Sequence, residues 1–269
     1  MSTILDKILE HKRQEVEIAR AAKSIDELKA EAVGMPKCRN FYKAVTKRNR
    51  RGVNVIAEVK KASPSAGVIR ADFDPVEIAK IYESCGADAI SVLTDEKYFQ
   101  GKLEYVRQIK EHVGVPILRK DFIVDQWQIY ESRAAGADAI LLIAEALKPG
   151  EIMDMLICAS DLGLTVLLEV HNADELLKIR SLIDFPRKGY SVLGINNRDL
   201  ATMVVDINTT SRLAELVGDK TKHFVSESGI KTREDVKKLK RIGTSAILIG
   251  ETLCASENIE SKFNELFAL

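Results

Sequence analysis

Eight short apolar segments alternate with longer segments of helical periodicity, and this alternation constrains the fold more than any other feature. The apolar segments are residues 53–59, 89–93, 116–118, 139–143, 165–170, 191–195, 223–225 and 246–249. Segments without polar alternation indicate strands buried on both faces, as in a parallel sheet covered by helices. Eight strand–helix units within 269 residues predict a (β/α)8 TIM barrel.

A recurring five-residue pattern supports this interpretation. Gly-Ala-Asp-Ala-Ile occurs at 86–90 and again at 136–140, and Gly-Thr-Ser-Ala-Ile at 243–247 resembles it. Each copy is typical of a glycine that ends a helix, followed by a turn into a buried strand. A doubly wound sheet is the alternative, but it usually has fewer strands and a glycine-rich first turn, and the sequence contains no GxGxxG.

Residues 1–50 lie outside the eightfold pattern and have helical character. Ile4, Leu5 and Ile8 fall on one apolar stripe, and Ser24 is placed as the N-cap of a second helix. We expect an N-terminal helical extension that packs on the barrel. Residues 1–269 would then form a single (β/α)8 barrel domain.

Composition excludes several classes of protein. Lys+Arg and Asp+Glu are equal at 40 each, so no basic excess points to nucleic acid. No apolar run is long enough to span a bilayer, and the charged N-terminus is unlike a signal peptide, so we expect a cytoplasmic protein. The 4 cysteines are dispersed without a CxxC, which predicts free thiols. The 4 histidines lack metal-binding spacing, so we expect no metal.

The first strand ends in a charged pair. Glu58 and Lys60 share a face, because side chains alternate along a strand, and the polar loop that contains Ser63 follows them. Burying a carboxylate beside an ammonium contributes little to stability, whereas the pair suits acid–base chemistry on an anionic substrate. In a barrel of this kind the active site lies at the C-terminal ends of the strands.

Polar side chains stand at most of the other strand ends as well. In chain order they are Thr94 and Asp95, Lys120, Glu145, Glu169 with His171, Asn196 with Arg198, Glu227, and Glu251. Any one of them could be an incidental polar residue. Ionisable or amide groups at six of the eight strand ends are hard to dismiss, and they predict a shared site.

The last two loops predict a phosphate site. Ser228 and Gly229 precede a helix that begins near Thr232, and Gly250 opens the last loop. Backbone N–H groups in such turns bind phosphate well, and these barrels commonly place phosphate after strands 7 and 8. We therefore expect a phosphorylated small molecule as the ligand.

Seven ordered motifs resemble those of the indole-3-glycerol-phosphate synthase family of tryptophan biosynthesis. They are IAEVKKASPS at 56–65, LTDEKYFQG at 93–101, LRKDFI at 118–123, LEVH at 168–171, GINNRDL at 194–200, SESGI at 226–230 and LIGE at 248–251. The resemblance covers essentially the whole chain. It implies ring closure of 1-(2-carboxyphenylamino)-1-deoxyribulose 5-phosphate, with loss of CO2 and water, by a carboxy-lyase that needs no metal or organic cofactor. It does not address contacts with other enzymes of the pathway.

The resemblance also implies catalytic roles. Lys120 would be the general acid that protonates the ketone oxygen during ring closure. Glu58 would position the lysines and couple to their charge, Lys60 would act beside it, and Glu169 would take part in the proton transfers of dehydration. A lysine ordinarily stays charged at neutral pH, and neighbouring carboxylates keep it protonated in a partly dry pocket.

The remaining matched residues would bind substrate. The phosphate would be held by Lys60, Ser228, Gly229, Gly250 and Glu251. Ser63, Asn196 and Arg198 would orient the substrate, with Arg198 near its carboxylate. Glu227 would contact hydroxyl or amine groups, and Phe99 and Phe122 would pack on the aryl ring.

Three positions depart from the family pattern. Ala66 and Lys102 stand where lysine and serine are common, and Leu168 stands where threonine is frequent. None of them removes a proposed catalytic residue. Two alternatives remain open: another cofactor-free barrel enzyme, such as a phosphosugar isomerase or a Schiff-base aldolase, and a non-catalytic barrel that binds a phosphorylated metabolite.

Overall fold

The computed structural model describes residues 3–180, 182, 189–217 and 223–268. Eight parallel strands close into a barrel in the order β1-β10-β9-β8-β7-β6-β5-β4. Their bounds are β1 Asn54–Val59, β4 Ala89–Leu93, β5 Ile117–Lys120, β6 Ala139–Ile143, β7 Thr165–Val170, β8 Ser191–Asn196, β9 Phe224–Glu227 and β10 Ala246–Ile249. The predicted barrel is confirmed, and the doubly wound alternative is wrong.

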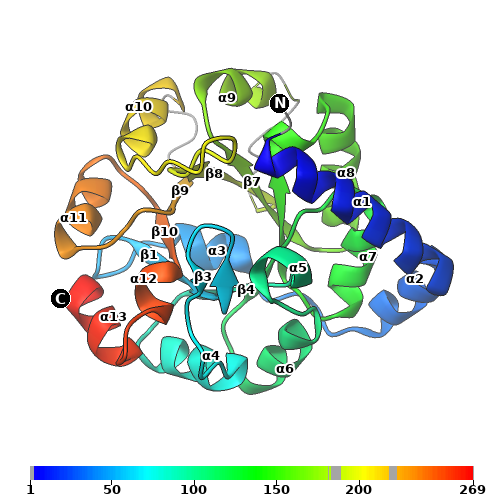
Figure 1. The fold of residues 1–269 in the computed structure, drawn as a ribbon, viewed down its shortest axis with the longest axis horizontal. Helices are drawn as coiled ribbons and strands as arrows, with labels where there is room; N and C mark the ends of the chain where they lie inside the picture. The colour runs from blue at the N-terminus through cyan, green and yellow to red at the C-terminus, as the bar shows by residue number, and fades with distance from the viewer. Residues whose placement is uncertain (1–2, 181, 183–188, 218–222, 269) are drawn as a thin grey trace.

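Helices surround the strands (Figure 1). Those of the repeating units are α4 Pro75–Ser84, α6 Glu104–His112, α7 Gln126–Ala134, α8 Pro149–Asp161, α9 Ala173–Arg180, α10 Asn208–Val217, α11 Arg233–Arg241 and α13 Ile259–Phe267. Short elements occupy the loops that follow strands: the β2 Ala62–Ser63 and β3 Gly67–Val68 hairpin, α5 Glu96–Phe99, η1 Ala144–Ala146 and α12 Glu251–Cys254.

The predicted N-terminal helical extension is confirmed, and it contains three helices, of which the sequence pattern predicts the first two: α1 Ile4–Ala22, α2 Ile25–Gly34 and α3 Phe41–Thr46. Thr3 caps α1 and Ser24 caps α2, each in a reciprocal capping box that satisfies free N–H groups of the first turn. Residues 1 and 2 of the predicted extension lie outside the described residues.

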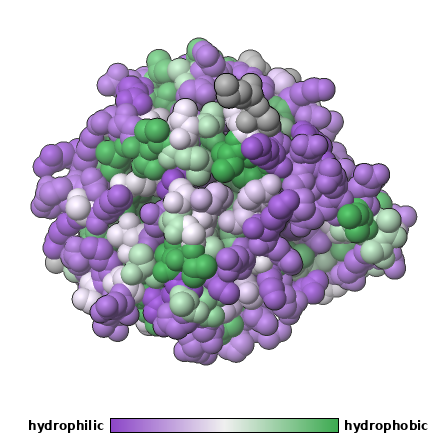
Figure 2. All heavy atoms as spheres, viewed as in Figure 1, coloured by the Kyte–Doolittle hydropathy of each residue, from purple (hydrophilic) through white to green (hydrophobic). Residues whose placement is uncertain are grey.

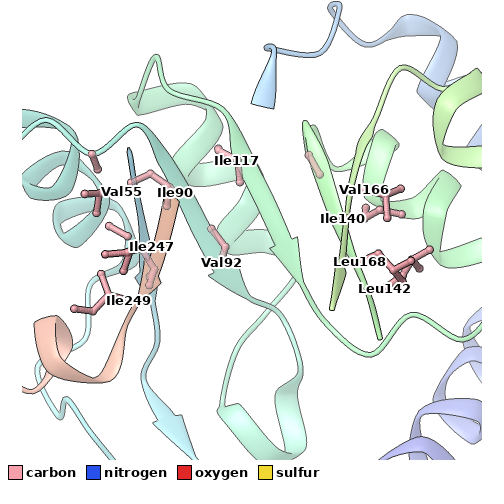
Figure 3. Close-up of a cluster of buried hydrophobic side chains, with 14 of the residues drawn as sticks. Val55, Ile90, Val92, Ile117, Ile140, Leu142, Val166, Leu168, Ile247 and Ile249 are labelled. Atoms are coloured by element: carbon pink, nitrogen blue, oxygen red, sulfur yellow. The ribbon is translucent and has the colours of Figure 1, made fainter. Parts of the chain in front are cut away.

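Alternation along the strands builds two hydrophobic layers. Val55, Ala57 and Val59 of β1 face outward and join the layer between strands and helices, which Figure 3 shows with the matching residues of β4, β6, β7 and β10. Ile56 faces inward and joins the interior of the barrel. Glu58 has the same parity as Ile56, so the pleat also directs its carboxylate inward.

The N-terminal helices contribute to the interior layer. Leu5 and Ile8 of α1 are part of the interior cluster, and so are Phe41 and Val45 of α3. The amide of Asn54, at the start of β1, donates to the Val45 carbonyl at 3.0 Å, so α3 lies at the N-terminal end of the barrel. In Figure 1, α1 lies in front of the end toward which the strands run.

Two strands extend two residues further than the sequence pattern indicates. The prediction ends one of them at residue 118, whereas β5 continues through Arg119 and Lys120, which pair with Val92 and Leu93 of β4. Likewise β9 continues through Glu227, which pairs with Asn196. Charged residues rarely belong to a buried strand, so hydropathy ends the strand too early where the chemistry begins.

Two predictions from composition have structural outcomes. All four cysteines are free thiols, with Cys158 and Cys254 buried. Within the described residues, none of the helices is long and apolar enough to cross a membrane. The face seen in Figure 2 is hydrophilic over much of its rim, with hydrophobic residues gathered nearer its centre.

Candidate active site

A cavity of about 340 Å³ opens at the C-terminal end of the barrel. Every residue to which the family resemblance assigns a role lines it: Glu58, Lys60, Ser63, Phe99, Lys120, Phe122, Glu169, Asn196, Arg198, Glu227, Ser228, Gly229, Gly250 and Glu251. Four other residues named at the strand ends do not line it: Thr94, Asp95, Glu145 and His171. A volume of this size holds a small organic molecule. The predicted convergence of the strand ends is therefore present.

The ammonium group of Lys120 lies at the centre of the charged residues. Its Nζ is 3.4 Å from Glu169 Oε2 and 3.6 Å from Glu227 Oε2. The three side chains come from β5, β7 and β9, and all are buried except for the part of Lys120 that faces the cavity. The barrel thus places one cation between two carboxyl groups that are distant in sequence.

Burial and charge separate the proton affinities of these groups. Burial alone would lower the pKa of Lys120, but the charges of Glu169, Glu227 and Glu58 raise it above its ordinary value. Burial would raise the pKa of Glu169, but Lys120 and His171 lower it below the usual range. Burial and the Glu169 charge together raise the pKa of Glu227 well above its ordinary value. Glu169 is therefore the ionised member of the pair, and Glu227 holds a proton to higher pH.

The predicted pairing of Glu58 with Lys60 is confirmed. Lys60 Nζ lies 2.8 Å from Glu58 Oε1 at the end of β1. Gly250 makes room for this pair, because a Cβ there would stand 2.8 Å from the Cβ of Glu58 and closer still to its carboxylate. Gly250 is thus required by the packing of Glu58, a reason that the sequence did not indicate.

Apolar side chains line the part of the cavity next to the C-terminal ends of β4, β5 and β6. The rings of Phe99 and Phe122 lie 6.1 Å apart between centroids. Ile4, Leu5 and Ile8 of α1 also line the cavity. Sequence reasoning recognised their stripe but assigned it only to packing, because periodicity does not say which surface a helix covers.

Polar groups line the part formed by β8, β9, β10 and β1. Arg198 donates to Ser65 Oγ at 3.0 Å and to Glu251 Oε2 at 3.2 Å, so it links three loops across the cavity mouth. Asn196 Oδ1 accepts the Arg198 backbone N–H at 3.0 Å and orients that loop. Ser63 Oγ accepts the Ala66 N–H at 3.2 Å, so this hydroxyl shapes its own hairpin.

The loop after β9 has a left-handed backbone at two successive residues. Ser228 has φ 64° and Gly229 has φ 77°, and a non-glycine residue such as Ser228 adopts this region rarely. A Cβ at Gly229 would also lie 2.6 Å from Val205 Cγ1. The helix predicted near Thr232 begins there, with Thr232 as the N-cap of α11.

A buried ion cluster anchors α1 to the loops of the site, and sequence reasoning missed it. Lys12 Nζ lies 2.9 Å from Asp95 Oδ2, 3.1 Å from Asp121 Oδ1 and 2.9 Å from Glu15 Oε2. Asp95 caps α5, which carries Phe99, and Asp121 lies between Lys120 and Phe122. Lys12 therefore connects the N-terminal helix to both aromatic walls.

Asn197 is a structural neighbour of the site. Its Nδ2 donates to the carbonyls of Glu227 and Ser228 at 2.9 and 3.0 Å, and its Oδ1 accepts from Thr210 at 2.8 Å. This amide holds the end of β9 next to β8. The sequence could have indicated this structural role. Asn197 is one residue after Asn196, so its side chain has the opposite parity and points away from the cavity.

One group of side chains could in principle hold a metal ion. Among the described residues, Glu145, His171 and Glu175 place one ligand atom each within 4.8 Å of one another. Ion pairing with Glu169 and Glu175 raises the pKa of His171 to about 10 against the opposing effect of burial, so the imidazole is cationic at neutral pH. A cationic imidazole offers no lone pair to a metal. The expected absence of a metal stays a prediction.

The sequence matches known proteins along almost its whole length. The family model described as Indole-3-glycerol phosphate synthase matches residues 5–266. The protein of that name from Geobacillus kaustophilus is 48% identical over 264 residues, which is 98% of this chain and 96% of the relative. That of Neisseria meningitidis serogroup C is 45% identical over 268 residues, 99% of this chain and 100% of the relative.

Comparison of structures identifies the same architecture. A 3-hexulose-6-phosphate synthase superposes with a TM-score of 0.62 at 13% identity, covering 80% of this chain and 99% of that one. A mutant tryptophan synthase alpha-subunit from Pyrococcus furiosus gives a TM-score of 0.60 at 16% identity, covering 80% and 98%. At such identities the likeness shows the fold alone.

Proposed function

This chain belongs to the indole-3-glycerol phosphate synthase family, and from that membership we propose how its own residues carry out the reaction. The chain is a carboxy-lyase. We propose that its substrate is 1-(2-carboxyphenylamino)-1-deoxyribulose 5-phosphate and that its products are indole-3-glycerol phosphate, CO2 and water. We propose further that α1 to α3 and the barrel act as one domain, since α1 lines the cavity.

The observation that carries the assignment of roles is the placement of Lys120 Nζ between Glu169 and Glu227. When the aryl carbon bonds to the ketone carbon, negative charge develops on the ketone oxygen. A charged lysine that faces the cavity supplies a proton to that oxygen. The carboxylates that raise the pKa of Lys120 keep it charged until this step.

The two carboxyl groups divide the later proton transfers. After CO2 leaves, the former ketone oxygen departs as water, and a proton is removed from the neighbouring ring carbon. Glu169 is ionised and serves as the base, because Lys120 and His171 lower its pKa. Glu227 holds a proton to higher pH, and its oxygens have no hydrogen-bond donor among the described residues, which suits contact with a substrate hydroxyl or amine.

The asymmetry of the cavity orients the substrate. The aryl ring packs against Phe99 and Phe122, and the phosphate lies toward Lys60, Gly229 and Gly250, on the other side of the barrel. Ser228, Gly229, Gly250 and Glu251 line that end in the turns after β9 and β10, where backbone N–H groups suit a phosphate, and Lys60 supplies a full positive charge. The reaction involves no overall oxidation or reduction, and the only groups that the protein itself must transfer are protons. We therefore propose that no metal or organic cofactor is needed.

The test is turnover of the carboxyphenylamino-deoxyribulose phosphate in EDTA, followed by indole fluorescence. The wild-type protein should form the indole product under these conditions. Lys120→Ala should lose kcat by about 10²–10⁴-fold. Lys80→Ala is the matched control, because Lys80 is exposed on the outer helix α4. No turnover by the wild type, or activity that returns only with a divalent ion, would refute the proposal.

A Schiff-base mechanism makes a different prediction. A lysine must be neutral to attack a carbonyl carbon, and the carboxylates around Lys120 favour its charged form. Borohydride added during turnover should therefore trap no covalent adduct. An adduct on Lys120 or Lys60, detected by mass spectrometry, would support the aldolase alternative instead.

A further inference from the structure

A buried imidazole, that of His171, lies directly behind the catalytic carboxylate of Glu169. His171 follows β7 and is buried, and its Nε2 lies 3.1 Å from Glu169 Oε1. The other oxygen of the same carboxylate, Oε2, contacts Lys120. Glu169 therefore bridges the cavity lysine and an imidazole that does not line the cavity.

The other ring nitrogen of His171 faces the protein surface. Nδ1 lies 3.5 Å from Glu175 Oε2 on α9 and 3.6 Å from Glu145 Oε2 on η1. The Glu175 side chain is 10% exposed, and that of Glu145 is 35% exposed. Glu175 Oε2 also accepts the backbone N–H of His171 at 3.0 Å, which holds this carboxylate next to the imidazole. A continuous row of ionisable groups thus runs from the rim to Lys120.

The proposed reaction needs such a row, because it consumes a proton. The substrate carboxylate leaves as neutral CO2, and the proton given to the ketone oxygen leaves in the water molecule. A second proton assists departure of the hydroxyl as water, and the proton released from the ring carbon offsets it in the overall count. One proton per turnover must therefore come from solvent. The proposed substrate site is the cavity itself, whereas Glu145, His171 and Glu175 lie outside its lining.

We propose that His171 is the positioning and proton-delivery residue of this site: it holds Glu169 toward Lys120 and, with Glu145 at the rim, passes one solvent proton per turnover to the Lys120–Glu169 pair. This inference rests on the proposed function. In each delivery the Nε2 proton of the cationic imidazole moves to Glu169 Oε1, which leaves a neutral ring that keeps its Nδ1 proton. Rotation of the ring then turns the bare Nε2 toward Glu145, which passes it a solvent proton and restores the cation, with a protonated nitrogen again facing Glu169.

The charges around His171 agree with this role. Glu169, Glu175 and Glu145 face it from β7, α9 and η1, and Asp199 acts on it from the loop after β8. The resulting pKa of about 10 keeps the imidazole charged through neutral pH. Burial and the charges of Glu175, Asp199 and Asp6 raise the pKa of Glu145, which brings the rim carboxyl closer to the pH at which it exchanges protons with water.

The test compares kcat and KM for wild type, His171→Gln, Glu145→Gln and the control Asp174→Asn, from pH 6 to 9 and at increasing imidazole concentration. Asp174 is an exposed carboxylate on the same helix turn as Glu175. We expect His171→Gln to lower kcat at least about tenfold with KM within about threefold, more so as pH rises. Imidazole should restore part of the loss and leave the wild type unchanged.

Each outcome decides the inference. Glu145→Gln keeps a partly exposed position and should fold, so a kcat loss that imidazole relieves in this variant supports the path even if His171→Gln unfolds. Wild-type kcat in Glu145→Gln, equal to that of Asp174→Asn, would overturn the rim end of the path. A His171→Gln loss confined to KM, or one that imidazole does not relieve, would overturn proton delivery. Wild-type protein without turnover would instead refute the proposed function.

Discussion

Lys12→Met should destabilise the protein strongly, although Lys12 lies outside the cavity. The substitution removes the ammonium that contacts Asp95 and Asp121 at 2.9 and 3.1 Å, while the two carboxylate side chains are 0% and 2% exposed. Arg119 still pairs with Asp121 at 3.0 Å, whereas no other cation of the described residues forms a salt bridge with Asp95. Removing one partner of a buried ion pair costs about 3–5 kcal/mol.

That loss predicts a measurable change in thermal unfolding. For a protein of this size, 1 kcal/mol corresponds to about 2–4 °C, so Tm should fall by roughly 6–20 °C. The measurement is far-UV circular dichroism at pH 7, with Lys7→Met as the matched control, because Lys7 is an exposed lysine of the same helix. KM should rise as well, since the Lys12 cluster holds the loops that carry Phe99 and Phe122.

The pH dependence separates this explanation from a simple packing defect. Burial would raise the pKa of Asp121, but Arg119 and Lys12 lower it from 3.8 to about 2. A lowered pKa contributes stability that is present above pH 3.8 and is lost as pH falls through about 2. In the Lys12→Met variant, Asp95 and Asp121 stay buried without the ammonium group. Protonation of these carboxylates at low pH removes the buried negative charge that destabilises the variant. The difference in Tm should therefore stay nearly constant from pH 7 to about pH 5 and narrow as pH falls from 3.8 toward 2. A loss of less than about 1 kcal/mol in the free energy of unfolding at pH 7 would refute the reasoning. So would a difference in Tm that does not narrow at low pH.

The remaining predictions concern substrate binding. Arg198→Ala should mainly raise KM, by about 1.5–3 kcal/mol in binding free energy, because a guanidinium facing the substrate carboxylate binds before CO2 leaves; steady-state kinetics with unchanged KM and a collapsed kcat would contradict this. Gly229→Val should weaken binding of indole-3-glycerol phosphate far more than binding of its dephosphorylated analogue, with a native circular dichroism spectrum. The valine side chain would meet Val205, and the backbone at this position has a positive φ that valine disfavours. Equal losses for the two ligands, measured by titration, would move the phosphate away from Gly229.

Sequence reasoning predicted the barrel because the repeated strand–helix pattern depends on local residue order. Parity then placed Glu58 with Lys60, and the rule that strand ends converge placed Lys120 near Glu169. Hydropathy ended β5 before Lys120 and β9 before Glu227, because charged residues in a buried strand contradict the pattern that defines the strand. The strand ends were thus misplaced where the chemistry lies.

Other features depended on contacts between distant segments, which no local pattern specifies. The stripe of Ile4, Leu5 and Ile8 predicts a buried face, but only the packing of α1 across the barrel makes it a wall of the cavity. The strand-end rule placed Glu145 and His171 at the same end of the barrel, but their contact at 3.6 Å depends on the pairing of β6 with β7 in the closed sheet.

By itself, the sequence determined the fold class, the residues at the strand ends and the family, since these follow from periodicity and from ordered motifs. Only the tertiary structure decided which carboxyl group is ionised. Glu169 and Glu227 are the same side chain chemically and look alike in the sequence. Their pKa values move in opposite directions because Glu169 contacts both Lys120 and His171, whereas Glu227 is buried beside the Glu169 charge. Proton affinity depends on distances and desolvation, and these exist only after the chain has folded.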